Sequence, residues 1–503
     1  MQRLRTLLIA LSLATLAAGC SHDPGTSLKI ALAYDDALGL DTADVTLSDR
    51  TESGRIAHQL LLLVPDELAG MDMMIEVWGR KAGKRAAYGT ATAVPRRGHT
   101  VAASVTLTAC TPSCTGAMLT SCTGPMVSCA LGCSEDGDAH CFGPRPSNGV
   151  DPTAADPLRG TTTISANATF DTDTGAIIGG LDRPAGTGIA AGVGYVQAPA
   201  SGPGGAPLGI FVFHNLTVEA GATVRFTGAR AAVLLVGDAA RIAGVINAAA
   251  GHPTPGPGGG AGGSEVGPAR GCGAGAPGVK SANRDSGGGG GGAGSTGGPG
   301  GDIGGTLGGL GGAACMPALL EPLQGGSGGG RGSPGGAASA AAGGSGGGAL
   351  QITALGSLEI TGTINAGGAG GEAAAGSSTD AGGGGGGGSG GAILLEAPTV
   401  ITGATAIVVA NGGGGGGGGG TIAGGPGDDG GTSTQPAQGG FGGELSANGG
   451  TGGSLGSPPD VGTGGATNGG GGGGAAGVIA IRGRTLMIAG TISPHATQAD
   501  VQR

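Results

Sequence analysis

The cysteines are the residues whose type and spacing could do chemistry. Six form a duplicated cluster in which each member of the first half recurs nineteen residues later: Cys110, Cys114, Cys122, Cys129, Cys133 and Cys141. An even set in an oxidising compartment favours disulfides. A zinc site is the alternative, but no Cys-x-x-Cys pair occurs and only His140 lies nearby. We predict disulfides with their connectivity left open, and a further bridge between Cys272 and Cys315 across a glycine-rich insert.

The remaining cysteine, Cys20, ends a segment typical of a secretory signal. A cationic head with Arg3 and Arg5 precedes a short apolar run that closes in the small residues Ala17-Ala18-Gly19. That run is shorter than the ~20 residues of a membrane-spanning helix. The segment therefore predicts export of the chain.

The ending Ala-Gly-Cys resembles the lipobox of bacterial lipoproteins, although Ala17 stands where leucine is commoner. The resemblance implies removal of residues 1–19 as a signal peptide, lipidation of Cys20 and a tether over residues 20–26. Ser21 after the cysteine implies the outer membrane, with the periplasmic or surface-facing side left open. An ordinary signal peptide with a chance cysteine is the alternative. The lipid is the only membrane attachment that we expect.

Composition limits the kind of core that the chain can build. Of 503 residues 125 are glycine, aromatic residues make up 2% and charged residues 12%. The core must therefore be narrow and aliphatic. The net charge of −10 and the isoelectric point near 5.1 argue against nucleic-acid binding, which needs a basic face.

Residues 27–109 predict a small β-sandwich, since short alternating runs are separated by turn residues. The expected strands are residues 28–34, 44–48, 74–78, 87–94 and 100–107. The unbroken apolar run 60–64 predicts a strand covered on both faces, and Trp78 is expected in the core. Residues 110–143 follow as the cysteine-stapled connector, and residues 144–160, rich in proline and aspartate, as a linker.

Residues 161–503 contain one repeated pattern. Each copy has a short aliphatic strand, a turn, a second apolar strand, a glycine and a third short strand; the copies begin near residues 232, 350, 393 and 478. Such strands cannot bury an apolar face alone, whereas stacked copies can. The pattern favours a right-handed parallel β-helix; an antiparallel sandwich is the alternative.

Glycine-rich tracts interrupt the repeat at about 251–348, 367–391 and 411–475, each time just after the third strand. They are therefore expected on one face. Their composition resembles the glycine-rich tails of mycobacterial PE-PGRS proteins, in composition only, because no PE-type N-terminal domain is present. Flexible coil and packed, extended polyproline-II-like segments remain equal alternatives.

No convergent catalytic or metal site emerges. The coil charges stand as isolated residues: Glu219, Arg225, Asp238, Arg241, Glu359, Glu396, Arg482 and Arg484. Gly-x-Ser-x-Gly matches around Ser327, Ser345 and Ser389 lack the strand and helix of a nucleophile elbow. The nonapeptide-like starts at 297–302 and 424–429 stand alone, and Asp171-Thr172-Asp173 predicts a polar turn rather than a calcium loop.

These observations together predict an all-β, lipid-anchored envelope protein with a structural or adhesive role. We expect no catalytic residue, cofactor or metal, and a partner that is a cell-surface polysaccharide or protein, not nucleic acid. The alternatives are a carbohydrate-active β-helix enzyme, in which the inserts assemble the site, and a polysaccharide-binding module.

Overall fold

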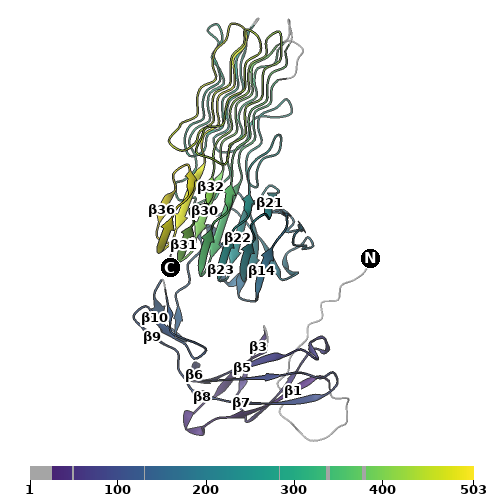
Figure 1. Ribbon diagram of the computed structural model, residues 1–503, viewed down its shortest axis with the longest axis vertical. Coiled ribbons are helices and arrows are strands. Elements are labelled where there is room, and N and C mark those ends of the chain that lie inside the picture. The colour runs from purple at the N-terminus through teal and green to yellow at the C-terminus, as the bar shows by residue number, and fades with distance from the viewer. Residues whose placement is uncertain are drawn as a thin grey trace. The chain divides into compact units, whose positions relative to one another are not determined.

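The computed structural model describes residues 25–47, 50–129, 131–281, 284–335, 340–376 and 381–502. The chain divides into two compact units, residues 1–142 and 143–503 (Figure 1). Regular structure is nearly all β, which confirms the predicted class. Within those ranges the helices are short 3-10 turns: η1 (Asp36–Leu38), η2 (Asp66–Leu68), η3 (Ser147–Gly149) and η4 (Pro152–Ala155).

Residues 25–109 of the first unit contain two sheets that share one apolar cluster. The smaller sheet has the order β4 (Gln59–Leu63), β1 (Ser27–Ala33), β7 (Thr100–Thr106). The larger has the order β3 (Arg50–Arg55), β2 (Thr42–Leu47), β5 (Met73–Lys81), β6 (Lys84–Ala93), β8 (Thr108–Ala109).

Alternation along these strands decides which side chains reach the shared core. In β1, Leu28 and Ile30 are fully buried while Lys29 between them is exposed. Trp78 is buried as expected, at 6% exposure. The expectation for residues 60–64 was wrong: β4 is an edge strand, so Leu60 and Leu62 face the core while Leu63 is 45% exposed.

Disulfides hold the connector, as the cysteine spacing predicted. The bridges are Cys110–Cys122, Cys114–Cys133 and Cys129–Cys141, and a fourth, Cys272–Cys315, spans the first glycine-rich tract. Only short strands occur in the connector: β9 (Ser113–Thr115), β10 (Met118–Thr120), β11 (Val127–Ser128), β12 (Cys133–Ser134) and β13 (His140–Cys141). Cross-links compensate there for the lack of a large apolar core.

Three long sheets build the second unit, and each turn of the chain adds one strand to each sheet. One sheet runs β14 (Thr161–Ile164), β20 (Asn215–Val218), β23 (Ala239–Ile242), β28 (Ser357–Ile360), β31 (Thr399–Thr402), β34 (Thr485–Ile488). A second runs β16 (Ile177–Gly179), β15 (Ala168–Asp171), β21 (Thr223–Thr227), β24 (Val245–Asn247), β29 (Thr363–Asn365), β32 (Ile407–Val409), β35 (Thr491–Ser493).

The third sheet, which we call the broad sheet, runs β17 (Gly188–Ala190), β18 (Val193–Ala198), β19 (Leu208–Phe213), β22 (Ala231–Val236), β27 (Ala349–Ala354), β30 (Ala392–Glu396), β33 (Val478–Arg482), β36 (Thr497–Ala499). From β19 onward its strands pair in parallel. A small hairpin, β25 (Lys280–Ser281) and β26 (Arg284–Asp285), lies in the first glycine-rich tract.

The repeated aliphatic segments stack in register between the sheets. In the broad sheet, equivalent positions form one buried ladder of Phe211, Leu234, Ile352, Leu395 and Ile481. The other two sheets contribute the ladders Leu216, Ala240, Leu358, Val400, Leu486 and Val224, Ile246, Ile364, Val408, Ile492. Each strand thus buries its apolar face against the neighbouring turns and the facing sheets.

The expected linker over residues 144–160 is instead packed on the outer face of the broad sheet. Val150, Ala155 and Leu158 are each 3% exposed and join an apolar cluster with residues of that sheet. The proline- and aspartate-rich composition concealed this spacing, and the aspartates form local caps: Asp151 Oδ1 accepts the Thr153 N–H at 3.0 Å. We call residues 144–158 the strap.

The glycine-rich tracts leave the sheets after the third strand of a turn, as expected, and return at the first strand of the next turn. Figure 1 shows them as extended segments that lie side by side beyond the strands. Hydrogen bonds join neighbouring segments, with few inside a segment. Of the two states that the sequence left open, the structure has the packed one. We call this assembly the glycine array.

Hydrogen bonds in the array have a period of three residues. In the segment 383–391, successive N–H groups donate to three different neighbours in rotation. Residues 383, 386 and 389 donate to 333, 330 and 327; residues 384, 387 and 390 to 469, 472 and 475; residues 385, 388 and 391 to 372, 369 and 366. Three residues per turn without internal hydrogen bonds is the geometry of a polyproline-II helix.

Segments in the interior of the array have neighbours on all sides. Segment 383–391 donates to three segments and accepts from three others, through Gly288, Gly344 and Gly413 among the donors. A Cβ atom built on Gly386 would lie 2.1 Å from the Gly289 carbonyl oxygen. Because no side chain fits between backbones this close, the interior segments consist almost wholly of glycine.

Outer segments follow a Gly-Gly-X pattern instead. Along residues 437–444, positions 437, 440 and 443 are buried, while 438, 441 and 444 are exposed. The exposed positions are Gln438, Phe441 and Glu444. The three-residue turn therefore puts every larger side chain of this segment on the outside.

Candidate functional site

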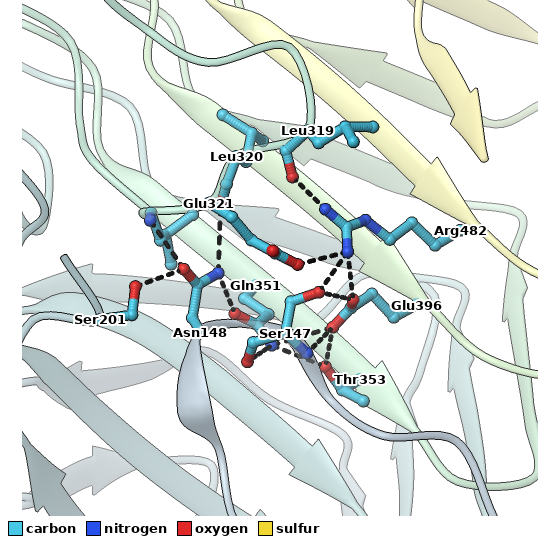
Figure 2. Close-up of polar contacts among 11 residues, drawn as sticks. Ser147, Asn148, Ser201, Leu319, Leu320, Glu321, Gln351, Thr353, Glu396 and Arg482 are labelled. Atoms are coloured by element: carbon cyan, nitrogen blue, oxygen red, sulfur yellow. Dashed lines mark hydrogen bonds and ion pairs between the residues drawn. The ribbon is translucent and has the colours of Figure 1, made fainter. Parts of the chain in front are cut away.

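The densest group of buried polar side chains lies on the outer face of the broad sheet (Figure 2). Gln351 and Thr353 come from β27, Glu396 from β30 and Arg482 from β33. The strap contributes Ser147 and Asn148, and Glu321 joins from the loop after Cys315. We call these residues the polar cluster.

Parallel pairing brings the cluster together. The register places Glu396 directly opposite Arg482 on the adjacent strand, with Nη1 of the arginine 3.9 Å from Oε1 of the glutamate. Both side chains are buried, at 0% and 2% exposure. The expectation that they are isolated charges was wrong, because eighty-six residues of sequence separate two positions that are neighbours in the sheet. Arg241 and Glu359 are also neighbours, on β23 and β28.

The carboxylate oxygens of Glu396 accept hydrogen bonds from hydroxyl and amide groups. The Thr353 hydroxyl donates to Oε2 at 2.8 Å, and Nε2 of Gln351 donates to the same oxygen at 3.0 Å. The Ser147 hydroxyl donates to Oε1. Burial raises the pKa of the Glu396 carboxyl, and these hydrogen bonds together with the charge of Arg482 only partly oppose that effect.

The pKa of the Glu321 carboxyl shifts in the opposite direction, although Glu321 contacts the same arginine. Burial would raise its pKa, but hydrogen bonds with Ser147 and Arg482 outweigh burial and lower the pKa of the Glu321 carboxyl. Arg482 therefore has one readily ionised partner at the margin of the cluster and one buried partner whose charge is disfavoured.

Asn148 fastens the strap to two further elements. Its Nδ2 donates to Gln351 Oε1 and to the Leu320 carbonyl, both at 3.0 Å (Figure 2). Its Oδ1 accepts from the Ser201 hydroxyl at 2.8 Å and from the Leu323 N–H at 2.9 Å. The strap covers Glu396, so a substrate cannot reach the carboxylate. The cluster works as a clamp that holds the strap and the loop after Cys315 on the broad sheet.

The other residues that the sequence singled out serve local structure. Asp171 Oδ1 accepts the N–H groups of Asp173 and Thr174 at 2.8 and 3.2 Å, which makes the polar turn that was expected. Ser389 Oγ accepts the Ser327 N–H at 2.8 Å, and both serines are buried in the glycine array. Neither serine has a histidine or carboxylate partner among the described residues.

The predicted lipidation of Cys20 and the predicted absence of a metal site concern other parts of the chain. Cys20 and the signal segment lie outside the described residues. In the parts of the chain that the structure describes, no three His, Cys, Asp or Glu side chains are grouped to hold a metal ion. No helix in those parts is long and apolar enough to cross a membrane.

The outer surface of the glycine array is the second candidate site, for binding rather than chemistry. Large apolar side chains are exposed on its outer segments and turns: Val266, Leu307, Leu310, Ile422, Phe441, Leu445 and Val461. Ile422, Phe441 and Leu445 lie close together among them, and a contiguous exposed apolar patch often marks a contact surface. The Gly-Gly-X pattern could have shown which residues face outward, but only once the segments were known to pack.

Comparison with known proteins supplies no relative. No family model matches the chain, and neither curated proteins nor solved structures show significant similarity to it.

Proposed function

We propose that this chain is a lipid-anchored cell-envelope protein with a structural or adhesive role and no catalytic activity. The lipid would be carried by Cys20 in the outer membrane. The first unit would be a β-sandwich, and the second a right-handed parallel β-helix extended by the glycine array. A cell-surface polysaccharide or protein would be the partner.

The glycine array is the observation that carries this proposal. Its interior is almost without side chains, and hydrogen bonds join the described segments to their neighbours. Apolar side chains are then presented outward from a rigid frame, which suits contact with another surface. The fully buried carboxylate of Glu396 is covered by the strap, which supports a role without catalysis.

Adhesion is tested with beads that carry the purified chain and are presented to cells of the same organism. We expect retention by the native chain and its loss in Gly386→Val, whose added side chain would separate the interior segments. Gly431→Ala is the matched control, because a Cβ there meets no atom within 4 Å. Equal retention of all three chains would exclude the array as the adhesive surface.

Anchoring is tested separately by metabolic labelling with a fatty acid. We expect label on the native chain and its recovery in outer-membrane fractions, and loss of both in Cys20→Ser. Turnover of any glycan in a panel of acidic polysaccharides would contradict the proposed lack of catalysis.

A further inference from the structure

Charge is distributed unevenly between the first and last glycine-rich tracts. The last tract, residues 411–475, has four carboxylates and no Lys, Arg or His: Asp428, Asp429, Glu444 and Asp460. The first tract has four cations: Arg270, Lys280, Arg284 and Arg331. It also has four carboxylates, but Asp285 is buried against Ser333 and Glu321 is paired with Arg482.

The two tracts contact each other directly, as in Gly298 N to Gly473 O, but one segment of each lies at an outer end of the array. One row of hydrogen-bonded segments crosses it: 437–443, 411–420, 382–391, 325–333 and 268–270. The contacts along the row are Gly440 N to Gly415 O, Gly416 N to Gly385 O, Gly386 N to Gly330 O, and Gly328 N to Arg270 O. We call the 437–443 end, which carries Glu444, the acidic edge, and the 268–270 end, which carries Arg270 with Arg331 nearby, the basic edge.

The acidic edge carries a protruding group of apolar side chains, Ile422, Phe441 and Leu445, which we call the knob. Phe441, the only aromatic residue of the three tracts, is 79% exposed. Ile422 and Leu445 beside it are 62% and 65% exposed. The Thr421 hydroxyl, 2.5 Å from Glu444 Oε2, ties the two turns together. Leu445 has a φ of 65°, a conformation that favours glycine, so neither burial nor backbone geometry accounts for a leucine here.

The basic edge carries a hollow of about 310 Å³. Val266, Pro268, Ala269 and Pro277 give it apolar walls, and Arg331 lines it beside Gly330. Glu265 also lines it, with Oε1 accepting the Ala340 N–H at 3.2 Å. Gly330 belongs to the row of hydrogen bonds that passes through Gly440, so the hollow and Phe441 lie at the same height on opposite edges.

We propose that copies of this chain associate side by side, with Phe441 of one copy seated in the hollow of the next. Glu444 of the first copy then faces Arg331 of the second. Phe441 and the hollow lie at the same level along the length of the glycine segments. A second copy that is shifted sideways along the row can therefore receive Phe441 in its hollow without being tilted. Such a contact uses two different surfaces, so it does not close on itself and produces an open row of copies. The inference does not depend on the adhesive role.

Cross-linking between two variants of the full chain, each with one added cysteine, tests this geometry. Phe441→Cys and Ala269→Cys are purified separately, mixed and oxidised gently. We expect a covalent dimer in the mixture, little product from either variant alone, and a ladder of larger products from the double variant. The control uses Val461→Cys in place of Phe441→Cys, because Val461 is 55% exposed but lies on another outer segment. It should give no dimer with Ala269→Cys.

Charge exchange supplies a second readout, by sedimentation velocity over a concentration series. Glu444→Lys should weaken association at least tenfold, Arg331→Glu likewise, and the two changes together should restore it. Retained melting temperatures show that these surface variants still fold. If Phe441→Cys alone gave as much dimer as the mixture, the contact would be symmetric, with residue 441 of each copy facing the other, and the proposal would be wrong. Absence of any dimer in the mixture, or undiminished association of Phe441→Ser, would overturn it.

Discussion

The two parts of the second unit have cores of opposite kinds. Between the three sheets the core is a set of aliphatic ladders, in which side chains fill the space and removing one leaves a cavity. In the glycine array the core is almost entirely backbone, and adding one methyl group to an interior glycine produces a clash. A single chain thus uses burial of side chains in one half and hydrogen bonding between bare backbones in the other. Order therefore does not require apolar side chains when glycine lets carbonyl and amide groups meet directly.

The largest expected effect is the loss of an aliphatic ladder position. Leu395→Ala, in the middle of the broad sheet, should lower the free energy of unfolding by about 2–5 kcal/mol, because the stacked neighbours cannot close the cavity. Chemical denaturation measures this loss. Met487→Ala, half exposed on β34, is the control and should change stability by less than about 1 kcal/mol. Equal losses would mean that the ladder is not the core.

An added methyl group in the array should have the next largest effect. Gly386→Ala should lower the free energy of unfolding by about 1–3 kcal/mol, since its Cβ would lie 2.1 Å from a backbone oxygen that cannot move cheaply. Hydrogen exchange should accelerate at glycine amides of the array and remain slow in the ladders. Gly431→Ala, which meets open space, should leave both unchanged. A neutral Gly386→Ala would show that the array is loosely packed.

The polar cluster should produce a pH dependence of stability. Burial raises the pKa of Glu396 in the folded chain above its ordinary 4.5. The folded state therefore holds this proton more tightly than the unfolded state, so the contribution of Glu396 is full below pH 4.5 and is lost as the pH rises through the folded pKa. Glu396→Gln cannot lose a proton, so its melting temperature should rise relative to native as the pH increases. A constant difference between pH 4 and 8 would refute this assignment.

The smallest effect is expected at an outward position of the array. Leu310→Ser replaces a side chain that is 70% exposed in a Gly-Gly-X segment, so stability should change by no more than about 0.5 kcal/mol. Thermal unfolding measures it, and Gly309→Ser next to it is the contrast. Its Cβ would lie 2.2 Å from the Ala276 carbonyl oxygen, so this change should destabilise the chain clearly. Similar results at both positions would deny the three-residue period.

Much of the sheet architecture could be read from spacing. Ala232, Leu350, Ile393 and Ile479 lie in register near the start of the repeated segments, and each buries its side chain only when the segments stack, so the pattern predicts contact between residues far apart. The even cysteine set likewise predicted disulfides, although the choice of Cys114–Cys133 between the two duplicated halves depended on how the loops lie. The strap was missed because three small or medium apolar residues among prolines do not distinguish a linker from a segment packed on a sheet.

By itself, the sequence determined where strands and glycine tracts alternate, because local spacing decides which faces are apolar and where backbones are free of side chains. Only the tertiary structure decided that Glu396 meets Arg482 and that Phe441 stands level with the hollow beside Arg331. Both depend on register between segments distant in the chain. A glycine segment offers many equivalent registers in isolation, so the strands at its ends and the neighbours around it select one.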